Sequence, residues 1–444
     1  MNRVNTLSAR CCQRAEHLQN ERTHTMNTPW ASLNGTAISL EPPLKTTQAR
    51  RLLAGRAWAS SLQDLSPDGA PTDLANIAAS LRSLRDAVTH QFVARGEMTE
   101  AVTVALAAGE HVFVYGPPGT AKSSLLRLFA EGIGGKFWRI VLNPDITRED
   151  IVGPLDPTAL KKGEWRRRWA GFATADLAFL DEVWKASPQV ANVLLDGLEE
   201  RRVVAGEDEQ AIPLLCAMAA SNEIPDVKET QAAYDRFLIR LSVSYLRDPD
   251  DVRSLLKADA GTSPITASVN TDEVRLLAAA AEVMALNPPQ DVVDTLVTLW
   301  QQVGQDGRAV SDRRWRKTLK AACAAALLES VPFAPRHLGV ARWTLWSEAD
   351  EEADIRNLVL GLTDPVGSDV LDTEALLADL KNAAAGLAGM KLQERAEVAG
   401  KARKLMTRCD KLLADPGSRP YKARLDVVKA EANAVVSQVL DLMG

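Results

Sequence analysis

The sequence predicts an α/β fold in which a parallel sheet is flanked by helices and is followed by helices alone. Apolar runs at residues 111–115, 177–180 and 213–218 each lead into a group of polar residues, as buried parallel strands do where they end at one edge of a sheet. A glycine-rich loop follows the first run and leads into a helical pattern. From about residue 268 onward, apolar residues recur at helical spacing.

The chain before this α/β core divides into an extension and two helical patterns. We expect residues 1–70 to be poorly ordered, since turn-forming residues gather at 65–72 as in a linker. Helical spacing begins at Asp73, and a second helix from Glu100 leads to the first strand. The core is therefore expected to span residues 71–247.

The loop GPPGTAKS at residues 116–123 lies between a strand and a helix, the context of a phosphate-binding loop. Glycines let backbone N–H groups face phosphates at a helix N-terminus, Lys122 neutralises phosphate oxygens, and the Ser123 hydroxyl can ligate Mg²⁺. Ala121 stands where glycine is usual, so we expect a negative φ there. A plain strand-to-helix turn is the alternative. The expected nucleotide-binding residues are Gly116, Pro117, Pro118, Gly119, Thr120, Ala121, Lys122, Ser123 and Ser124.

Two adjacent carboxylates, Asp181 and Glu182, end the apolar run at 177–180 and lie 59 residues after Lys122. Carboxyl ends of parallel strands form the usual site of such sheets. Asp181 is therefore expected to hold Mg²⁺, and Glu182 to polarise the attacking water. An acidic helix start after an edge strand is the plainer alternative. The position of the two carboxylates after a phosphate-binding loop argues against that alternative.

Two further residues follow in order. Asn222 comes after the run at 213–218, so its amide is expected beside the γ-phosphate or the water. Arg236, within YDRF at 234–237, is a candidate arginine finger, a cation that stabilises the charge of the transition state. Taken alone, Asn222 would be a turn residue and Arg236 a surface ion-pair partner.

Taken together, GPPGTAKS, LAFLDEVWKA, AASNEIPD, AYDRFLIRL and VSDRRW resemble the MoxR family of AAA+ ATPases, over about residues 85–346. DEVWKA, YDRFLIRL and VSDRRW resemble its RavA branch. The resemblance implies ATP and Mg²⁺ as cofactors and makes an alanine before the loop lysine usual. The roles it implies are phosphate and metal binding by Lys122 and Ser123, metal binding by Asp181, catalytic base for Glu182, sensor 1 for Asn222, finger for Arg236 and sensor 2 for Arg313. Arg240 and Arg314 remain alternatives for the last two roles.

Two segments inside the core are not needed for nucleotide chemistry. Residues 150–171 contain Lys162-Gly163 and the cluster from Trp165 to Trp169, which predict a hairpin that either grips a protein or nucleic acid or simply packs with solvated arginines. Residues 201–213 predict a second hairpin with an acidic tip. The resemblance places the second hairpin toward the central pore of a ring.

The remaining chain is expected to be helical. Helical patterns at residues 265–346 predict an all-α lid, with Arg313 at a helix start so that the lid reads the γ-phosphate. Residues 347–444 predict a C-terminal helical hairpin, with a long helical stretch over about 372–414 and a returning helix after the break at 415–420. RavA-like proteins carry a β-rich head on such a stalk. This chain shows no β-rich segment there, so a partner of that head is not carried over.

Composition restricts the function further. Hydrophobic residues make up 46% and charged residues 25% of the 444 residues, which is ordinary for a globular protein. Five scattered cysteines and five histidines indicate neither a disulfide framework nor a zinc site. The net charge of −6 argues against bulk nucleic-acid binding, and no apolar run is long enough to span a bilayer. We expect a cytoplasmic protein.

The resemblance implies an ATP-hydrolysing homo-oligomeric ring, expected to be a hexamer, that remodels or activates a partner protein or complex. Such ATPases act with a protein that contains a von Willebrand factor A domain. One alternative is a nucleic-acid motor or loader, since AAA+ cores drive both kinds of work. The other is a nucleotide-gated scaffold that assembles but turns over little ATP.

Overall fold

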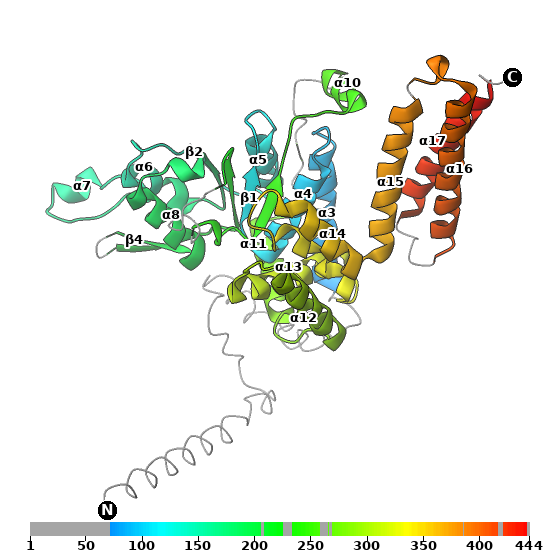
Figure 1. The fold of residues 1–444 in the computed structure, drawn as a ribbon. Helices are drawn as coiled ribbons and strands as arrows, with labels where there is room; N and C mark the ends of the chain where they lie inside the picture. Colours follow the sequence, from blue (N-terminus) through cyan, green and yellow to red (C-terminus); the bar gives the residue numbers. More distant parts are fainter. Residues whose placement is uncertain are drawn as a thin grey trace, which may run out of the picture. The chain divides into compact units, whose positions relative to one another are not determined.

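The computed structural model describes residues 72–205, 208–224, 233–257, 265, 269–384, 386–415 and 421–441; the predicted extension at residues 1–70 lies outside them. A five-stranded parallel sheet with the order β2-β3-β6-β1-β7 forms the centre of the α/β core (Figure 1). Its strands are β1 (Val112–Tyr115), β2 (Phe137–Val141), β3 (Leu177–Asp181), β6 (Cys216–Ser221) and β7 (Ile239–Ser242).

The three central strands are apolar almost without interruption because helices cover both faces of the sheet. Helix α5 (Lys122–Gly132) packs on β2 and β3, and α4 (Gly96–Ala108) packs on β1 and β7. Helix α8 (Pro188–Glu200) contributes Val190 and Leu194 to a core cluster with Phe113 of β1. The predicted α/β core is therefore confirmed. Helix α3 (Thr72–Thr89) packs against α4 and α5.

The first insertion differs from the predicted hairpin. It holds two short helices, α6 (Arg148–Val152) and α7 (Pro157–Leu160), and its two arms meet at a single antiparallel bridge between Leu155 and Arg167. Helix α7 forms because the Asp156 carboxylate caps it and Pro157 begins it. Trp165 is 76% exposed, whereas Trp169 packs against the core. The chain returns to β3 through η3 (Gly171–Thr174).

The second insertion is the predicted hairpin. Strands β4 (Arg202–Ala205) and β5 (Asp208–Ala211) pair antiparallel, directly after α8. The prediction of a hairpin is confirmed, while part of its acidic tip, at residues 206–207, lies outside the described residues. Between β3 and α8 the chain makes one short turn of helix, η4 (Val183–Lys185).

The described chain after β7 contains only helices among its regular elements. As far as Thr363 they are α10 (Pro249–Lys257), α11 (Thr271–Met284), α12 (Gln290–Gln305), α13 (Asp312–Glu329), η5 (Pro335–Trp343) and α14 (Glu351–Thr363). Asn270 and Glu273 form a capping box at the start of α11, as the sequence pattern favours. Helix α13 packs on α4, α11 and η5, and α14 packs on η5 and α12.

The C-terminal segment forms three long helices with a core of their own: α15 (Pro365–Ala384), α16 (Leu392–Leu413) and α17 (Lys422–Asp441). The predicted helical stretch over 372–414 is helical but not continuous, because the chain breaks near Gly386 into η6 (Leu387–Gly389) before α16 begins. The predicted pairing of the last two helices is found, and α15 packs against both of them. No helix in the described ranges is long and apolar enough to cross a membrane.

Candidate nucleotide-binding site

The strand order gathers three of the predicted features at one edge of the sheet. β6 lies between β1 and β3, and its register sets Ser221 opposite Tyr115 and Ala220 opposite Asp181. The loop at 116–121, the acidic pair and Asn222 therefore all follow the carboxyl ends of neighbouring strands. Parallel α/β sheets bind ligands at this edge.

The phosphate-binding loop depends on two unusual backbone conformations. Gly116 has φ +145°, and a Cβ atom there would lie 2.0 Å from the Val243 carbonyl oxygen, so only glycine fits. Ala121 has φ +66° and directly precedes α5. The expectation of a negative φ at Ala121 is wrong: the loop holds an alanine in the left-handed region, which costs about 1 kcal/mol. Helix α5 then presents its first N–H groups, which have no acceptor within the helix, toward the loop.

Lys122 folds back over the loop that precedes it. Its Nζ atom donates to the carbonyl oxygens of Gly116 at 2.7 Å and Pro117 at 3.0 Å, and the residue is 8% exposed. Burial lowers the pKa of Lys122, and the charges of Asp181 and Glu182 oppose that shift. The ammonium group thus lies beside the loop and within electrostatic reach of both carboxylates.

Arg95, which the sequence analysis missed, ties the loop to the segment after β7. Its Nε donates to the Thr120 carbonyl at 3.2 Å, and its Nη2 donates to the Ser244 carbonyl at 3.2 Å. A cavity of about 350 Å³ lies here, lined by residues that include Met98 and Tyr245. No local pattern marks Arg95, because both of its partners are distant in sequence.

The two carboxylates at the end of β3 each face a basic group. Arg139 of β2 pairs with Asp181, with 3.3 Å between Nη2 and Oδ2. The Oε2 atom of Glu182 is buried and lies 3.2 Å from the Nζ atom of Lys185. Glu182 has φ +53°, a conformation that non-glycine residues adopt mainly where the surrounding structure enforces it, often at functional sites.

Asn222 is exposed at the end of β6. The next residue is held in a tight turn, because the Glu223 N–H donates to Ser221 Oγ at 3.0 Å and the Glu223 carbonyl accepts from Trp184 Nε1 at 3.1 Å. Asn222 thus follows the strand that lies between the loop and the acidic pair.

Arg236 lies at the opposite edge of the sheet, where the strands begin, in the turn that precedes β7. Its alternative, Arg240, is fully buried: its guanidinium donates to the Trp346 carbonyl at 2.6 Å and to the Tyr234 carbonyl at 3.1 Å, and it stacks 3.7 Å from the centroid of the Tyr234 ring. Burial and the nearby Arg314 lower the pKa of Arg240. Arg240 is therefore committed to contacts inside its own chain.

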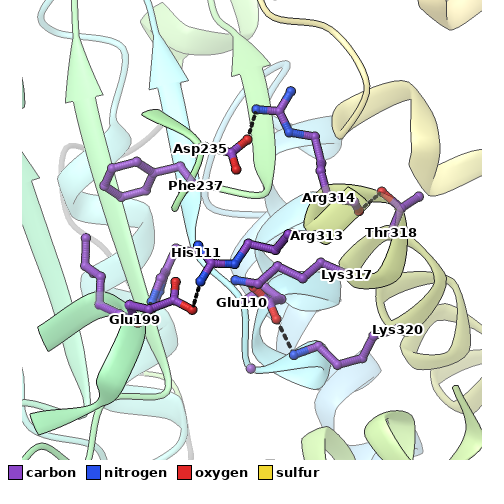
Figure 2. Close-up of polar contacts among 12 residues, drawn as sticks. Glu110, His111, Glu199, Asp235, Phe237, Arg313, Arg314, Lys317, Thr318 and Lys320 are labelled. Carbon is purple, nitrogen blue, oxygen red and sulfur yellow. Dashed lines mark hydrogen bonds and ion pairs between the residues drawn. The ribbon is translucent and has the colours of Figure 1, made fainter. Parts of the chain in front are cut away.

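Arg313 and Arg314 begin α13, also near the amino ends of the strands (Figure 2). Arg313, 41% exposed, forms an ion pair with Glu199 at the end of α8, next to Leu198, whose carbonyl lies 3.0 Å from His111 Nε2. Arg314 is 5% exposed and pairs with Asp235 at 2.6 Å. The structure therefore does not bring Arg313 to the phosphate-binding loop of the same chain, because α13 packs at the opposite edge of the sheet.

Comparisons with known proteins agree with this architecture. Residues 79–284 match the family model of the MoxR domain in the MoxR-vWA-beta-propeller ternary systems. An uncharacterised protein of Methanocaldococcus jannaschii is 30% identical over 312 residues, which cover 70% of this chain and 81% of that protein. Chaperone MoxR1 of Mycobacterium tuberculosis is 29% identical over 214 residues, 46% of this chain and 55% of the relative.

The solved structure of a proposed ATPase from Cytophaga hutchinsonii matches with a TM-score of 0.54 and 17% sequence identity. The match covers 65% of this chain and 96% of the chain of that ATPase. At that identity the likeness shows the fold alone. The fold and the site define a P-loop protein of the AAA+ class. The chain belongs to the MoxR family of AAA+ ATPases.

The residues present fit ATP and Mg²⁺. A buried ammonium group, a helix N-terminus and a glycine that leaves no room for a side chain suit a row of phosphates. The Ser123 hydroxyl and the Asp181 carboxylate are the hard oxygen ligands that Mg²⁺ prefers, and Mg²⁺ completes its shell with phosphate oxygens and water.

Proposed function

We propose that this protein hydrolyses ATP within a homo-oligomeric ring, expected to be a hexamer, and that the cycle remodels or activates a partner protein or complex. One observation carries the proposal. The loop, the acidic pair and Asn222 follow the carboxyl ends of adjacent strands, while Arg236 and Arg313 lie near the amino ends. A site divided in this way is completed when Arg236 and Arg313 of one subunit approach the phosphates of the nucleotide bound to the next subunit.

Within one subunit, Lys122 would neutralise the β- and γ-phosphate oxygens, and Ser123 and Asp181 would hold Mg²⁺, which supplies charge neutralisation when bound. Glu182 would orient and polarise the attacking water. Asn222 would position that water or the γ-phosphate. Phosphoryl transfer needs such positioning and charge stabilisation more than covalent chemistry.

The cavity beside Arg95 would receive the base of the nucleotide. It adjoins the loop through the bond from Arg95 to Thr120, and its lining combines apolar Met98 with polar Ser242 and Ser244. Ligand sites commonly pair an apolar lining with a few fixed polar groups in this way.

Arg236 is the better candidate for the finger, because Arg240 would have to leave several buried hydrogen bonds to reach another subunit. We infer that Arg313 likewise acts on the neighbour. It is the more exposed of the first two arginines of α13, and its ion pair with Glu199 lies near the amino end of β1.

A von Willebrand factor A domain protein is the partner we propose. Support comes from the matching family model, which describes MoxR domains of systems that contain such a protein, and from a relative named as a chaperone. The RavA-like branch remains part of the proposal, on the strength of the DEVWKA, YDRFLIRL and VSDRRW segments.

Steady-state ATPase assays with nucleotide-binding measurements test the motor. We expect Lys122→Ala to lose ATP binding, and Glu182→Gln to bind ATP but turn over at least about 100-fold more slowly. Glu131→Gln, a change of an exposed carboxylate on α5, serves as the control and should match the wild type. Near-normal turnover of Glu182→Gln would remove Glu182 from the role of base.

The same assays separate the alternatives. Salt-sensitive stimulation of ATPase activity by DNA or RNA would favour a nucleic-acid motor. Tight ATP binding with negligible turnover in a formed ring would favour a scaffold. Stimulation by the von Willebrand factor A protein, without nucleic acid, is the result that our proposal predicts.

A further inference from the structure

Asp235, the residue directly before Arg236, is bonded to the first turn of α13 through both carboxylate oxygens. Oδ1 accepts from Arg314 Nη2 at 2.6 Å, and Oδ2 accepts from Ser311 Oγ at 3.1 Å. Ser311 also caps α13, because its Oγ accepts from the Arg314 N–H at 3.3 Å. Figure 2 shows Asp235 and Arg314 facing one another, with Arg313 on the same helix.

The charges favour this bond. Burial by itself would raise the pKa of Asp235, but Arg314, the Ser311 hydroxyl and Arg240 lower it below its ordinary value, so the carboxylate stays ionised. Arg314 is only 5% exposed. A buried guanidinium that loses its carboxylate is left uncompensated, which makes such a contact costly to break.

The other side of the turn is fixed as well. Arg240 donates to the carbonyl oxygens of Tyr234 at 3.1 Å and Phe237 at 3.3 Å, the two residues that flank Asp235 and Arg236. Arg240 and Arg314 also both donate to Ser347 Oγ, at 3.3 Å and 3.4 Å. The backbone that carries Arg236 is thus held by Arg240 on one side and by α13 on the other.

We propose that Asp235 is a positioning residue, which locks the turn of Arg236 to the first turn of α13 so that Arg236 and Arg313 approach the neighbouring subunit's phosphates as one rigid unit. The inference rests on the proposed function, in which Arg236 acts on the neighbour. It deepens that function, because any movement of α13 would then move the finger. Small displacements of a catalytic group are enough to cost about 100-fold in rate.

A purely structural role for Asp235 makes a different prediction. Loss of fold would impair a subunit's own phosphate-binding loop together with its finger. Loss of positioning would impair the finger alone, and a neighbour with an intact finger would compensate. Rings that mix two variants separate these cases.

The experiment uses full-length Asp235→Ala mixed with full-length Lys122→Ala. Alone, Asp235→Ala should form rings and bind ATP within about twofold of the wild type, while turnover falls at least about tenfold. Lys122→Ala subunits keep their finger and should restore hydrolysis at mixed interfaces. Asp312→Asn, a change of the exposed carboxylate beside Ser311, is the matched control and should leave turnover unchanged.

Arg236→Ala mixed with Lys122→Ala runs in parallel. If that mixture, in rings shown to be mixed, regains no activity, the finger does not act on the neighbour and the proposed function fails. If it regains activity but Asp235→Ala turns over like the wild type, loses ATP binding, or is not rescued, the positioning inference is overturned.

A second pair of variants covers the case in which Asp235→Ala does not fold. Asp235→Asn keeps an acceptor oxygen but loses the charge, and should show a smaller, rescuable loss of turnover. The exchange Asp235→Arg with Arg314→Asp should regain turnover relative to either single change. A folded exchange variant without any regain would contradict the proposed lock.

Discussion

Arg139 on β2 and Asp181 on β3 form an ion pair across the two strands, with 3.3 Å between Nη2 and Oδ2. Arg139 also lies over the Phe179 ring, 5.8 Å from its centroid. The guanidinium group of Arg139 therefore lies beside the Asp181 carboxylate, which we propose as a Mg²⁺ ligand. Both side chains are partly exposed, so the pair is worth about 0.2–1 kcal/mol.

Arg139→Gln is therefore expected to strengthen Mg²⁺ binding, because the metal no longer competes with a guanidinium for Asp181. The half-saturating Mg²⁺ concentration should fall by about 1.4- to fivefold, the equivalent of that pair energy. Magnesium titrations of nucleotide binding and of turnover measure it. Arg127→Gln, which removes an arginine over Phe137 of the same strand, is the control. An unchanged or higher Mg²⁺ requirement in Arg139→Gln would contradict the competition.

Ala121→Gly should stabilise the fold. The residue has φ +66°, which costs an alanine about 1 kcal/mol and a glycine almost nothing, although glycine's greater freedom in the unfolded chain returns part of the gain. Thermal unfolding should show a rise of a few degrees at most. Ala186→Gly, at φ −65°, has no strain to relieve and should be destabilised. If both variants lose the same amount of thermal stability, the left-handed conformation of Ala121 does not lower the stability of the folded chain.

Local pattern was enough to predict the central strands, the loop and the acidic pair, because each of these is encoded by residues adjacent in sequence. Arg95 and Arg139 could not be found in this way. Their partners are 25 and 42 residues away or more. The pairing of β2 with β3 brings Arg139 to Asp181, whereas the packing of α4 on β1 and β7 brings Arg95 to its partners. The sequence motif around Arg313 likewise gave its helix but not the edge of the sheet on which that helix packs.

The C-terminal three-helix unit α15–α17 is expected to be dispensable for hydrolysis, whereas α14 is not. The unit has its own core. Helix α14 is instead tied to the α/β core, because Arg356 pairs with Glu97 of α4 at 2.8 Å. Its Glu351 also accepts from the Ser347 N–H at 2.7 Å and so holds the segment before the helix. A chain that ends at Asp364 should therefore keep its turnover. A chain that ends at Trp346 should lose stability, since it also lacks the Ser347 hydroxyl that Arg240 and Arg314 share.

Measurements of turnover, oligomeric state and thermal unfolding on both truncations decide the point. The shorter chain serves as the matched comparison for the longer one. If the chain that ends at Asp364 is folded and oligomeric but inactive, the three-helix unit must be part of the motor.

Glu110 joins the start of β1 to α13 and should make stability depend on acid pH. Its carboxylate is 3% exposed and accepts from Lys317 Nζ at 2.9 Å and from Lys320 Nζ (Figure 2). Burial by itself would raise the pKa of Glu110, but the two lysines together lower it well below its ordinary value of 4.5. Because the pKa is lower in the folded chain than in the unfolded one, the stabilisation is complete above about pH 4.5 and is lost progressively as the pH falls below it.

Glu110→Gln should accordingly lower the free energy of unfolding by about 3 kcal/mol at pH 7, because it leaves two partly buried ammonium groups without their counter-charge. The difference from the wild type should shrink at pH 4 and below, where the unfolded chain already holds the proton that folding must remove from Glu110. Denaturant unfolding at pH 7, 5 and 4 measures this, with the exposed Glu131→Gln as the control. A destabilisation of the same size at all three pH values would mean that Glu110 acts by shape and hydrogen bonding alone, since only its ionised form attracts the two lysines.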